Sequence, residues 1–459
     1  MTSDVVVIGA GISGLAVAHG LVRRGRTVTV LEEAPVAGGV IGTARRDGAF
    51  YERGPNSTLD TSPKVGVLLR DAGLDGEREN ASEDAAIRYI VRDGALVALP
   101  TSPPKFFTTH AFSMGAKLAL LREPFVPPTP DGVEESIAQF VRRRLGSEFL
   151  NYAIDPLVAG IYAGDPERVS VAAAFPKLLA LEKKYGSLIK GQIQGARERK
   201  KSGEVAKNTA PSFSFKKGMQ TLTDGLARTL PGLECNVRVE RIAREGGEYV
   251  IGGTRDGAPR EVRARVVVLA TPAPQASGLV RGLAPEAAGA LAAIDYAAVA
   301  IVASLYRRAD VGHSLRGFGF LVPRVEGRGI LGTLFSSSMF RGRTTGDTVL
   351  LTTFVGGRRN PDRYALSDAD MGAMVQGEMR GLVAASAAPL WQEIVRWPQA
   401  IPQYDLGHLD RLAHVDRTEA ALQDFWFFAN YRGGVSVSDR IVKGGELAIT
   451  IDEKLKHSR

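Results

Sequence analysis

Three glycines at positions 9, 11 and 14 form the pattern in this sequence with the clearest chemical meaning. They follow the apolar run Val5–Ile8 and precede the helix-like segment LAVAHGLVRRG. In a turn from a strand into a helix, the first glycine permits the tight turn, the second lets the backbone approach a pyrophosphate, and the third lets helix and strand pack closely. The helix N-terminus then faces the negative charge. The pattern predicts a nucleotide-binding turn over Gly9, Ala10, Gly11, Ile12, Ser13 and Gly14.

An acidic residue and a second glycine pair extend this site. Glu32 follows Leu31 in the strand-like segment TVTVLEE, at the distance from the turn where a carboxylate accepts hydrogen bonds from a ribose. The doublet Gly38-Gly39 gives a second close backbone approach to one extended cofactor. A nicotinamide dehydrogenase would in addition need a hydride partner and an acid–base group. The arrangement favours FAD bound in one piece.

Length and composition indicate what kind of protein must position this site. At 459 residues the chain exceeds one typical core, so two or three domains are expected. Its content of 44% apolar and 24% charged residues is that of a soluble globular protein. Cys235 is the only cysteine, which excludes an intramolecular disulfide and a cysteine-cluster metal site and favours a reducing compartment. The six histidines do not pair at metal-ligand spacing, so no metal is predicted.

The N-terminal sequence and the net charge restrict the expected localisation and the kinds of binding partner. We expect no secretory signal and no membrane-spanning segment, because no basic leader and no stretch of about 18 to 20 apolar residues is present. The net charge of +8 suits an acidic small molecule, an anionic membrane face or nucleic acid. The densest basic run, Gly195–Lys207, lacks interleaved aromatics and is typical of a solvated loop, so no nucleic-acid partner is expected.

Apolar periodicity divides the rest of the chain. A helical pattern covers 133–201, with Asp131 as its predicted cap. Strand candidates follow at 235–245, 248–257 and 260–273, and a second strand-rich region begins near residue 296. The C-terminal segment predicts a strand, a glycine loop and a helix. The nucleotide domain is therefore expected to be assembled from separated pieces with other segments inserted between them.

Several longer motifs resemble one known family. The segments ERGPNS, GIYAGD and IPQYDLGH, in this order, with the N-terminal turn and NYRGGVSVSD, resemble protoporphyrinogen oxidase within the flavin monoamine oxidase superfamily. The turn is shared with many flavoproteins, whereas the other motifs are much more specific. The resemblance runs from about Ser3 to Glu446.

This resemblance implies an activity and a fold. Family members use non-covalent FAD to oxidise protoporphyrinogen IX to protoporphyrin IX in haem biosynthesis, removing six electrons with oxygen as acceptor and releasing hydrogen peroxide. The expected fold class is α/β: an FAD-binding Rossmann-like domain with an inserted mixed-sheet substrate domain and a helical domain that contacts the membrane. The expected ranges are 1–86, 207–290 and 396–459 for the FAD domain, 87–104 and 291–395 for the substrate domain, and 105–206 for the helical domain.

The resemblance also carries site residues. Besides the turn, it implies cofactor contacts at Glu32, Glu33, Gly39, Val40, Gly54, Pro55, Asn56, Ser57, Val239, Trp397, Val435, Ser436 and Val437. Substrate contacts are implied at Arg88, which would pair a propionate, and at Gly160, Phe318, Leu321, Leu334 and Phe354, which would hold the macrocycle. Arg92 is the alternative to Arg88. No side chain recommends itself as a general base, so the catalytic group stays unassigned, and a structural hydrogen-bonding role is expected for His408.

Two departures from the family pattern stand in the last loop. Ala429 and Arg440 occupy positions where many relatives have glycine and cysteine. Covalent flavin attachment through a C-terminal cysteine is excluded, because Cys235 lies in the middle of the chain. Oxidation of coproporphyrinogen III to coproporphyrin III is the nearest alternative activity. Amine or carotenoid oxidation on the same scaffold and a non-enzymatic escort protein that has lost its flavin are further alternatives.

Localisation and partners are likewise expectations. The segment 103–128 places aromatic and aliphatic residues among lysines and arginines, which suits an interfacial anchor but equally suits packing against the protein's own helices. The resemblance implies a cytoplasmic protein that lies peripherally on the inner face of the cytoplasmic membrane. A product hand-off to ferrochelatase and a homodimer are left open by the same analogy.

Overall fold

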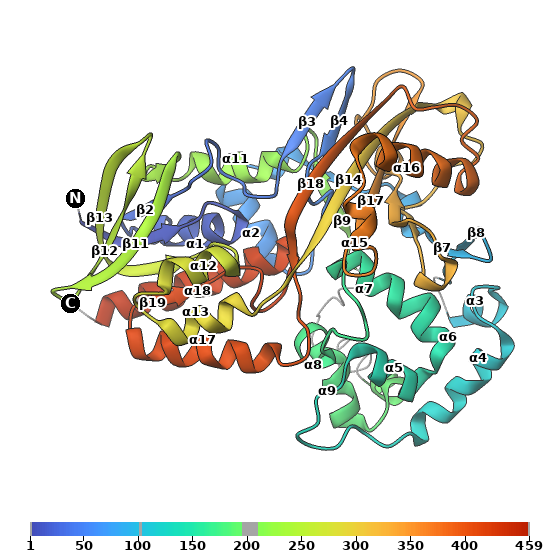
Figure 1. Ribbon diagram of the computed structural model, residues 1–459, viewed down its shortest axis with the longest axis horizontal. Coiled ribbons are helices and arrows are strands. Elements are labelled where there is room, and N and C mark those ends of the chain that lie inside the picture. The colour runs from blue at the N-terminus through green and yellow to red at the C-terminus, as the bar shows by residue number, and fades with distance from the viewer. Residues whose placement is uncertain (1, 101–102, 195–209, 458–459) are drawn as a thin grey trace.

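The computed structural model describes residues 2–100, 103–194 and 210–457. Figure 1 shows a body at the left that contains both chain ends, a second sheet at the upper right, and a group of helices at the lower right. The basic run Gly195–Lys207 and the predicted domain boundary between 206 and 207 lie outside the described residues. No helix among the described residues is long and apolar enough to cross a membrane.

The left body is built on a sheet whose strand order is β10-β2-β1-β13-β12-β11, with β19 beside β13. Strand β1 is central and parallel to β2 and β13, and its residues Val5, Val6 and Val7 are fully buried. A strand with both faces covered reads as a continuous apolar run, as this one does. The strands are β1 (Thr2–Ile8), β2 (Val28–Leu31), β10 (Leu233–Glu234), β11 (Val237–Glu245), β12 (Glu248–Arg255), β13 (Ala258–Leu269) and β19 (Phe425–Phe427), which confirms the three central strand candidates.

Helices cover both faces of this sheet. On one face α1 (Ile12–Val22) and α18 (Val437–His457) lie side by side. A Cβ added to Gly20 would lie 2.7 Å from that of Ala448, and one added to Gly444 would lie 2.7 Å from that of Ala16. Because the paired positions rise together, the two helices are parallel and their N-termini lie at the same end. The other helices around the sheet are α2 (Pro63–Asp71), α11 (Gln220–Arg228), α12 (Ala273–Val280), α13 (Pro285–Ala292) and α17 (His408–Leu422).

The second sheet has the order β18-β14-β17-β16-β15-β7-β8. Its long strands β14 and β18 pair antiparallel over most of their length, and α16 (Asp368–Leu382) packs its buried methionines and Val375 on one face. The predicted domain boundary between 395 and 396 falls inside β18. The strands are β7 (Arg88–Arg92), β8 (Ala95–Ala98), β14 (Tyr296–Arg307), β15 (Gly319–Leu321), β16 (Ile330–Leu334), β17 (Thr348–Gly356) and β18 (Trp391–Pro402). Of these, β14 to β17 lie in the predicted strand-rich region.

Two small sheets connect the bodies. Strands β3 (Thr43–Arg46) and β4 (Ala49–Glu52) form a hairpin. Strand β9 (Ser212–Phe215) lies between β5 (Thr58–Leu59) and β6 (Arg78–Asn80). The segment that leaves the helical group thus returns against residues from the first part of the chain.

The helical group starts differently from the sequence prediction. Asp131 was predicted as the cap, but helix α5 begins at Ile137 and Ser136 caps it. The Ser136 hydroxyl accepts from the Gln139 N–H, and the Gln139 side chain accepts from the Ser136 N–H. This reciprocal capping box satisfies two N–H groups together, so the local pairing decides the start. The helices are α3 (Pro103–Thr108), α4 (Met114–Ala119), α5 (Ile137–Leu145), α6 (Ser147–Phe149), α7 (Asp155–Tyr162), α8 (Val171–Ala174) and α9 (Pro176–Tyr185).

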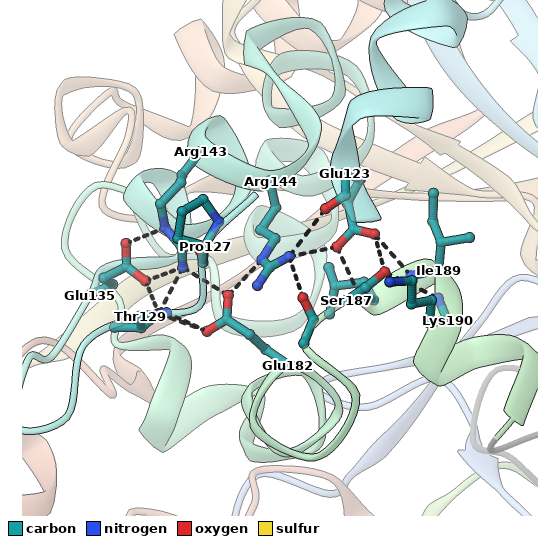
Figure 2. Close-up of polar contacts among 12 residues, drawn as sticks. Glu123, Pro127, Thr129, Glu135, Arg143, Arg144, Glu182, Ser187, Ile189 and Lys190 are labelled. Carbon is teal, nitrogen blue, oxygen red and sulfur yellow. Dashed lines mark hydrogen bonds and ion pairs between the residues drawn. The ribbon is translucent and has the colours of Figure 1, made fainter. Parts of the chain in front are cut away.

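A buried ion network holds this group together (Figure 2). The Arg144 side chain is fully buried and donates to Glu182 at 2.5 Å and to Glu123 at 3.0 Å. Its neighbour Arg143 donates to Glu135 at 2.6 Å and to Glu182 at 2.9 Å. Burial alone would raise the pKa of the Glu182 carboxyl, but hydrogen bonds from Thr129 and both arginines hold that pKa below its usual range. The network joins four segments of the helical group.

Candidate functional site

The glycine turn between β1 and α1 has the geometry that its sequence predicts. Gly9 has φ +101°, a conformation that side chains rarely adopt. A Cβ on Gly14 would lie 1.9 Å from the Gly9 carbonyl oxygen, so α1 can pack this closely only with glycine there. A Cβ on Gly11 meets no atom within 4 Å. The N-terminus of α1, with Ile12 and Ser13 in its first turn, therefore faces open space across Gly11.

The Glu32 carboxylate lies beside this turn. Its Oε2 accepts from the Ala10 N–H at 2.6 Å, and its Oε1 accepts from the Ala34 N–H at 2.9 Å. The backbone thus fixes one carboxylate at the end of the open space, where a ribose hydroxyl can share it. Glu33 is exposed and lies 3.5 Å from Arg238.

The opposite wall of this end comes from β11. The Val237 N–H donates to the Glu32 carbonyl at 2.8 Å, and Val239 follows two residues later, half-buried. Burial and then the nearby Glu32 carboxylate raise the pKa of the Cys235 thiol. The only cysteine of the chain therefore lies next to the predicted ribose position.

Two further segments approach the turn. The Gly38 N–H donates to the Ala10 carbonyl at 2.8 Å, and a Cβ on Gly39 would lie 3.3 Å from the Gly11 Cα. A Cβ on Gly54 would lie 2.0 Å from the Val40 carbonyl oxygen. The structure therefore brings the turn, the second glycine pair and the segment that continues through Pro55 and Ser57 together, although they are separated in sequence.

Asn56 links this assembly to the second sheet. It is buried, and its Oδ1 accepts from the Ser336 hydroxyl at 3.4 Å. The buried Arg343 donates to the Asn56 carbonyl at 3.3 Å and pairs with Glu52, which is also fully buried. Sequence reasoning missed Arg343 and Glu52. Glu52 lies inside the quoted motif ERGPNS, but no local pattern connects it with an arginine 291 residues away.

The C-terminal glycine loop completes the cofactor side. Gly433 and Gly434 have φ +73° and +115°, and Val435, Ser436 and Val437 then enter α18. The Ser436 hydroxyl accepts from the Asp439 N–H at 3.1 Å, in the manner of a helix cap. Because α1 and α18 are parallel, this second helix N-terminus lies at the same end as the glycine turn. The predicted strand, loop and helix are confirmed here.

The implied substrate residues share one face of the second sheet. Directly paired positions on neighbouring strands place their side chains on the same face. Gly319 pairs with Arg88 and with Leu334, and Gly332 pairs with Leu321 and with Phe354. Arg88, Leu321, Leu334 and Phe354 therefore form one floor, with gaps where the two glycines lack side chains.

Neighbouring residues border this floor. The Arg88 guanidinium lies 5.3 Å from the centre of the Phe318 ring, and a Cβ on Gly160 would lie 3.0 Å from Leu321 Cδ2. Trp397 pairs with Val299 on the same face, and its indole N–H donates to the Arg53 carbonyl at 2.5 Å. Ser336, which follows β16, donates to Asn56, so the floor lies next to Asn56 and the glycine segments. The structure thus brings the implied cofactor and substrate residues to one region between the two sheets.

The comparisons with known proteins agree with this geometry. A model of the flavin-containing amine oxidoreductase family matches residues 12–429. The chain belongs to this family. Its open helix N-terminus, ribose-side carboxylate and closely approaching glycines fit an extended dinucleotide cofactor, so the family's FAD suits the residues that are present. The chain is an FAD-dependent oxidoreductase.

Individual relatives of this family cover nearly the whole chain. Protoporphyrinogen oxidase 2 of Arabidopsis thaliana is 33% identical, over 97% of this chain and 92% of its own length. Coproporphyrinogen III oxidase of Bacillus subtilis is 26% identical over 96% of each. A crystal structure from Exiguobacterium sp. 255-15 matches with a TM-score of 0.79 at 25% identity, covering 99% of both chains. The resemblance to protoporphyrinogen oxidase, the α/β fold class and the FAD cofactor are confirmed.

Within the described residues, no group of three histidine, cysteine, aspartate or glutamate side chains could hold a metal ion. His408 is buried and its Nε2 is bonded to the Tyr431 carbonyl, so it does not border the floor. Polar groups at this floor include the Arg88 guanidinium, the Asn56 amide and the Ser336 hydroxyl. Such an arrangement suits an apolar, acidic molecule beside a flavin.

Proposed function

We propose that this protein oxidises protoporphyrinogen IX to protoporphyrin IX in haem biosynthesis. The observation that carries the proposal is the half-buried apolar floor with one exposed arginine at its edge, in a chain whose relatives at 32–33% identity are protoporphyrinogen oxidases. FAD supplies the two-electron acceptor when it is bound. Six hydrogens leave the substrate over three turnovers, and three oxygen molecules leave as hydrogen peroxide.

The residues of the floor would hold and orient the macrocycle. Leu321, Leu334 and Phe354 offer a flat apolar surface, and Asn56 lies at its cofactor end. Arg88 is exposed and free to turn toward a carboxylate, whereas Arg92 is engaged by Glu148 at 3.0 Å and by the Ala111 carbonyl. This difference favours Arg88 as the partner of a propionate.

Coproporphyrinogen III is the second candidate substrate. Coproporphyrinogen III oxidases of Bacillus subtilis and Propionibacterium freudenreichii are 26% and 29% identical to this chain over more than nine tenths of it. Their substrate carries four propionates, and protoporphyrinogen carries two. The higher identity to the plant enzymes favours the first proposal.

The deciding experiment is aerobic turnover of the purified protein with each porphyrinogen separately, followed by porphyrin fluorescence. We expect a higher kcat/KM for protoporphyrinogen IX. A clear preference for coproporphyrinogen III would replace the substrate while leaving the flavin site intact, and turnover of neither would refute porphyrinogen oxidation. Arg88→Ala should raise KM about tenfold and leave the flavin spectrum unchanged. Arg316→Ala, an exposed arginine paired with Asp84, is the control.

We also propose peripheral attachment to the cytoplasmic membrane. Large apolar side chains in the segment from α3 to the residues after α4 are 58–84% exposed, namely Phe107, Met114, Leu118, Leu121 and Phe125. Such a cluster favours burial at a lipid interface. Phe125→Glu should release the protein from anionic vesicles in a sedimentation assay. Val325→Glu, at an exposed apolar residue in another part of the chain, should not. A product hand-off to ferrochelatase and a homodimer stay predictions.

A further inference from the structure

Three consecutive carbonyl groups after β19 each meet a buried side chain. The Arg440 guanidinium donates to the Ala429 carbonyl at 2.8 Å, and the Tyr404 hydroxyl donates to the Asn430 carbonyl at 2.6 Å. His408 Nε2 lies 2.9 Å from the Tyr431 carbonyl. A loop carbonyl is ordinarily satisfied by water, so side chains on three in succession fix the path of this loop unusually tightly.

All three side chains are enclosed by protein. Arg440 and His408 are 1% exposed and Tyr404 is 2% exposed. Burial lowers the pKa of His408 to about 4, so its ring is neutral at pH 7. Because a carbonyl can only accept, the single ring proton must be on Nε2 for this bond to form. The bond is therefore formed by the neutral ring.

The Tyr404 hydroxyl also closes the loop on itself. It accepts from the Gly434 N–H at 3.0 Å while it donates to Asn430, so one phenol holds both ends of the segment 430–434. The turn between them uses the positive φ values of Gly433 and Gly434. Val435, Ser436 and Val437 follow immediately, at the N-terminus of α18.

The donors from IPQYDLGH are themselves fixed on the helical group. The Tyr404 carbonyl accepts from the Ser170 N–H at 2.8 Å, and the Gly407 N–H donates to Glu134 at 2.8 Å. The rings of Tyr404 and His408 stack with centroids 4.3 Å apart. The glycine loop of the cofactor body is thus tied to the helical group through Tyr404 and the residues that follow it.

We propose that Tyr404, His408 and Arg440 are positioning residues for the flavin, because they hold the loop 429–434 and so fix Val435–Val437 at the cofactor. We call these three side chains the carbonyl clamp. The inference rests on the proposed cofactor contacts of Val435–Val437. Its consequence is that the clamp controls FAD affinity without touching substrate.

The first test is Tyr404→Phe, which removes one hydroxyl and keeps the ring stacked on His408. Apoprotein titrated with FAD should bind about tenfold more weakly, as expected when two buried hydrogen bonds are lost, and the visible circular dichroism of bound flavin should change. Tyr306→Phe is the matched control, because that tyrosine is also buried and its hydroxyl has no hydrogen-bond partner among the described residues. Unchanged affinity and dichroism in Tyr404→Phe would overturn the proposal.

The second test uses a pair of variants at His408. His408→Gln keeps a side-chain N–H donor for the Tyr431 carbonyl and should retain most FAD affinity, whereas His408→Leu should lose it. Equal losses of FAD affinity in the two variants would show that the N–H donor at position 408 has no role. If the loss of FAD affinity were accompanied by a loss of thermal stability of the apoprotein, the variants would be acting through general packing. That result would also overturn the proposal. Wild-type protein that binds no FAD would instead refute the cofactor assignment on which the clamp rests.

Discussion

The helical group and the glycine turn differ in the partners of their polar groups. In the helical group, Arg144 is fully buried between Glu123 and Glu182, and side chains of opposite charge meet inside the protein. At the turn, the polar groups are backbone N–H groups and the Glu32 carboxylate, arranged around the open space at Gly11. In the helical group the charged side chains pair with one another, whereas at the turn the Glu32 carboxylate is held only by backbone N–H groups and the first turn of α1 has no side-chain cap.

This difference teaches how to separate a structural polar cluster from a binding one. A network whose partners are protein side chains contributes to stability only if it stays complete, since removing one member leaves an uncompensated buried charge. An uncapped helix N-terminus beside Gly11 has no charged partner inside the protein to lose, and it favours an anionic ligand. Substitutions in the two regions should therefore separate stability from cofactor binding.

The largest expected effect comes from breaking the network. Arg144→Met should destabilise the folded protein by about 3 to 5 kcal/mol, because Glu123 and Glu182 stay buried without their shared cation. Urea unfolding would measure the loss, and FAD affinity of the protein that remains folded should be unchanged. Arg142→Met, on an exposed arginine of the same helix paired with Glu167, is the control. A neutral Arg144→Met would show that the network is not a stability element.

Filling the open space at the turn should weaken FAD binding while leaving the stability of the protein unchanged. A Cβ at Gly11 meets no atom within 4 Å and the residue has an ordinary φ of −69°, so Gly11→Leu should hardly change the thermal stability of the apoprotein. FAD affinity should fall more than about 100-fold, or roughly 2.7 kcal/mol, because the side chain occupies the cofactor's approach. Gly278→Leu, an exposed glycine with free space on another helix, controls for the added side chain. A yellow Gly11→Leu protein would contradict the placement of the pyrophosphate.

A smaller change sharpens the ribose end of the site. Glu32→Gln is isosteric but turns one acceptor into a donor that faces a backbone N–H of Ala10 or Ala34. FAD affinity should fall about tenfold, measured by fluorescence titration. Glu33→Gln should have a smaller effect, although Glu33 is also an implied cofactor contact, because its side chain is exposed and lies 3.5 Å from Arg238, whereas backbone N–H groups fix Glu32. Equal losses in the two variants would argue against a specific role for Glu32.

The smallest expected effect is on the acid limb of stability. Burial alone would raise the pKa of Glu135, but hydrogen bonds from Arg143 and Thr129 lower it below the ordinary value of 4.5. A lowered folded-state pKa stabilises the protein above the ordinary value, and this contribution is lost as pH falls through the folded-state pKa. Urea unfolding between pH 7 and pH 3 should show the loss, about 1 kcal/mol, and Glu135→Gln should flatten that part of the profile.

Sequence patterns predicted the parts of this fold that depend on local order. The turn, the strands β11 to β13 and the final strand, loop and helix follow from glycine spacing and apolar runs that act over a few residues. The buried position of Arg144 was not predictable in this way, because three consecutive arginines on α5 have the composition of a solvated helix face. Only its distant partners Glu123 and Glu182 make burial tolerable.

The candidate site was predictable to a similar extent. The resemblance supplied the residues of the floor, and strand pairing explains why they share a face. The structural hydrogen-bonding role expected for His408 is confirmed, but the roles of Tyr404 and Arg440 in the carbonyl clamp were missed. Its hydrogen bonds join residues that are 11 to 30 positions apart in the sequence. Contacts at such irregular separations leave no periodic signal in a sequence.

The parallel packing of α1 on α18 sets an order of events during biosynthesis. The first helix leaves the ribosome with its buried face uncovered, and its neighbour emerges only when nearly all of the chain has been made. Contacts between such distant segments form late in folding. A nascent chain stalled before residue 437 carries the glycine turn but not the second helix that lies beside it. We therefore expect cofactor loading to be completed only after translation, and we expect a prematurely terminated chain to keep the buried face of α1 uncovered.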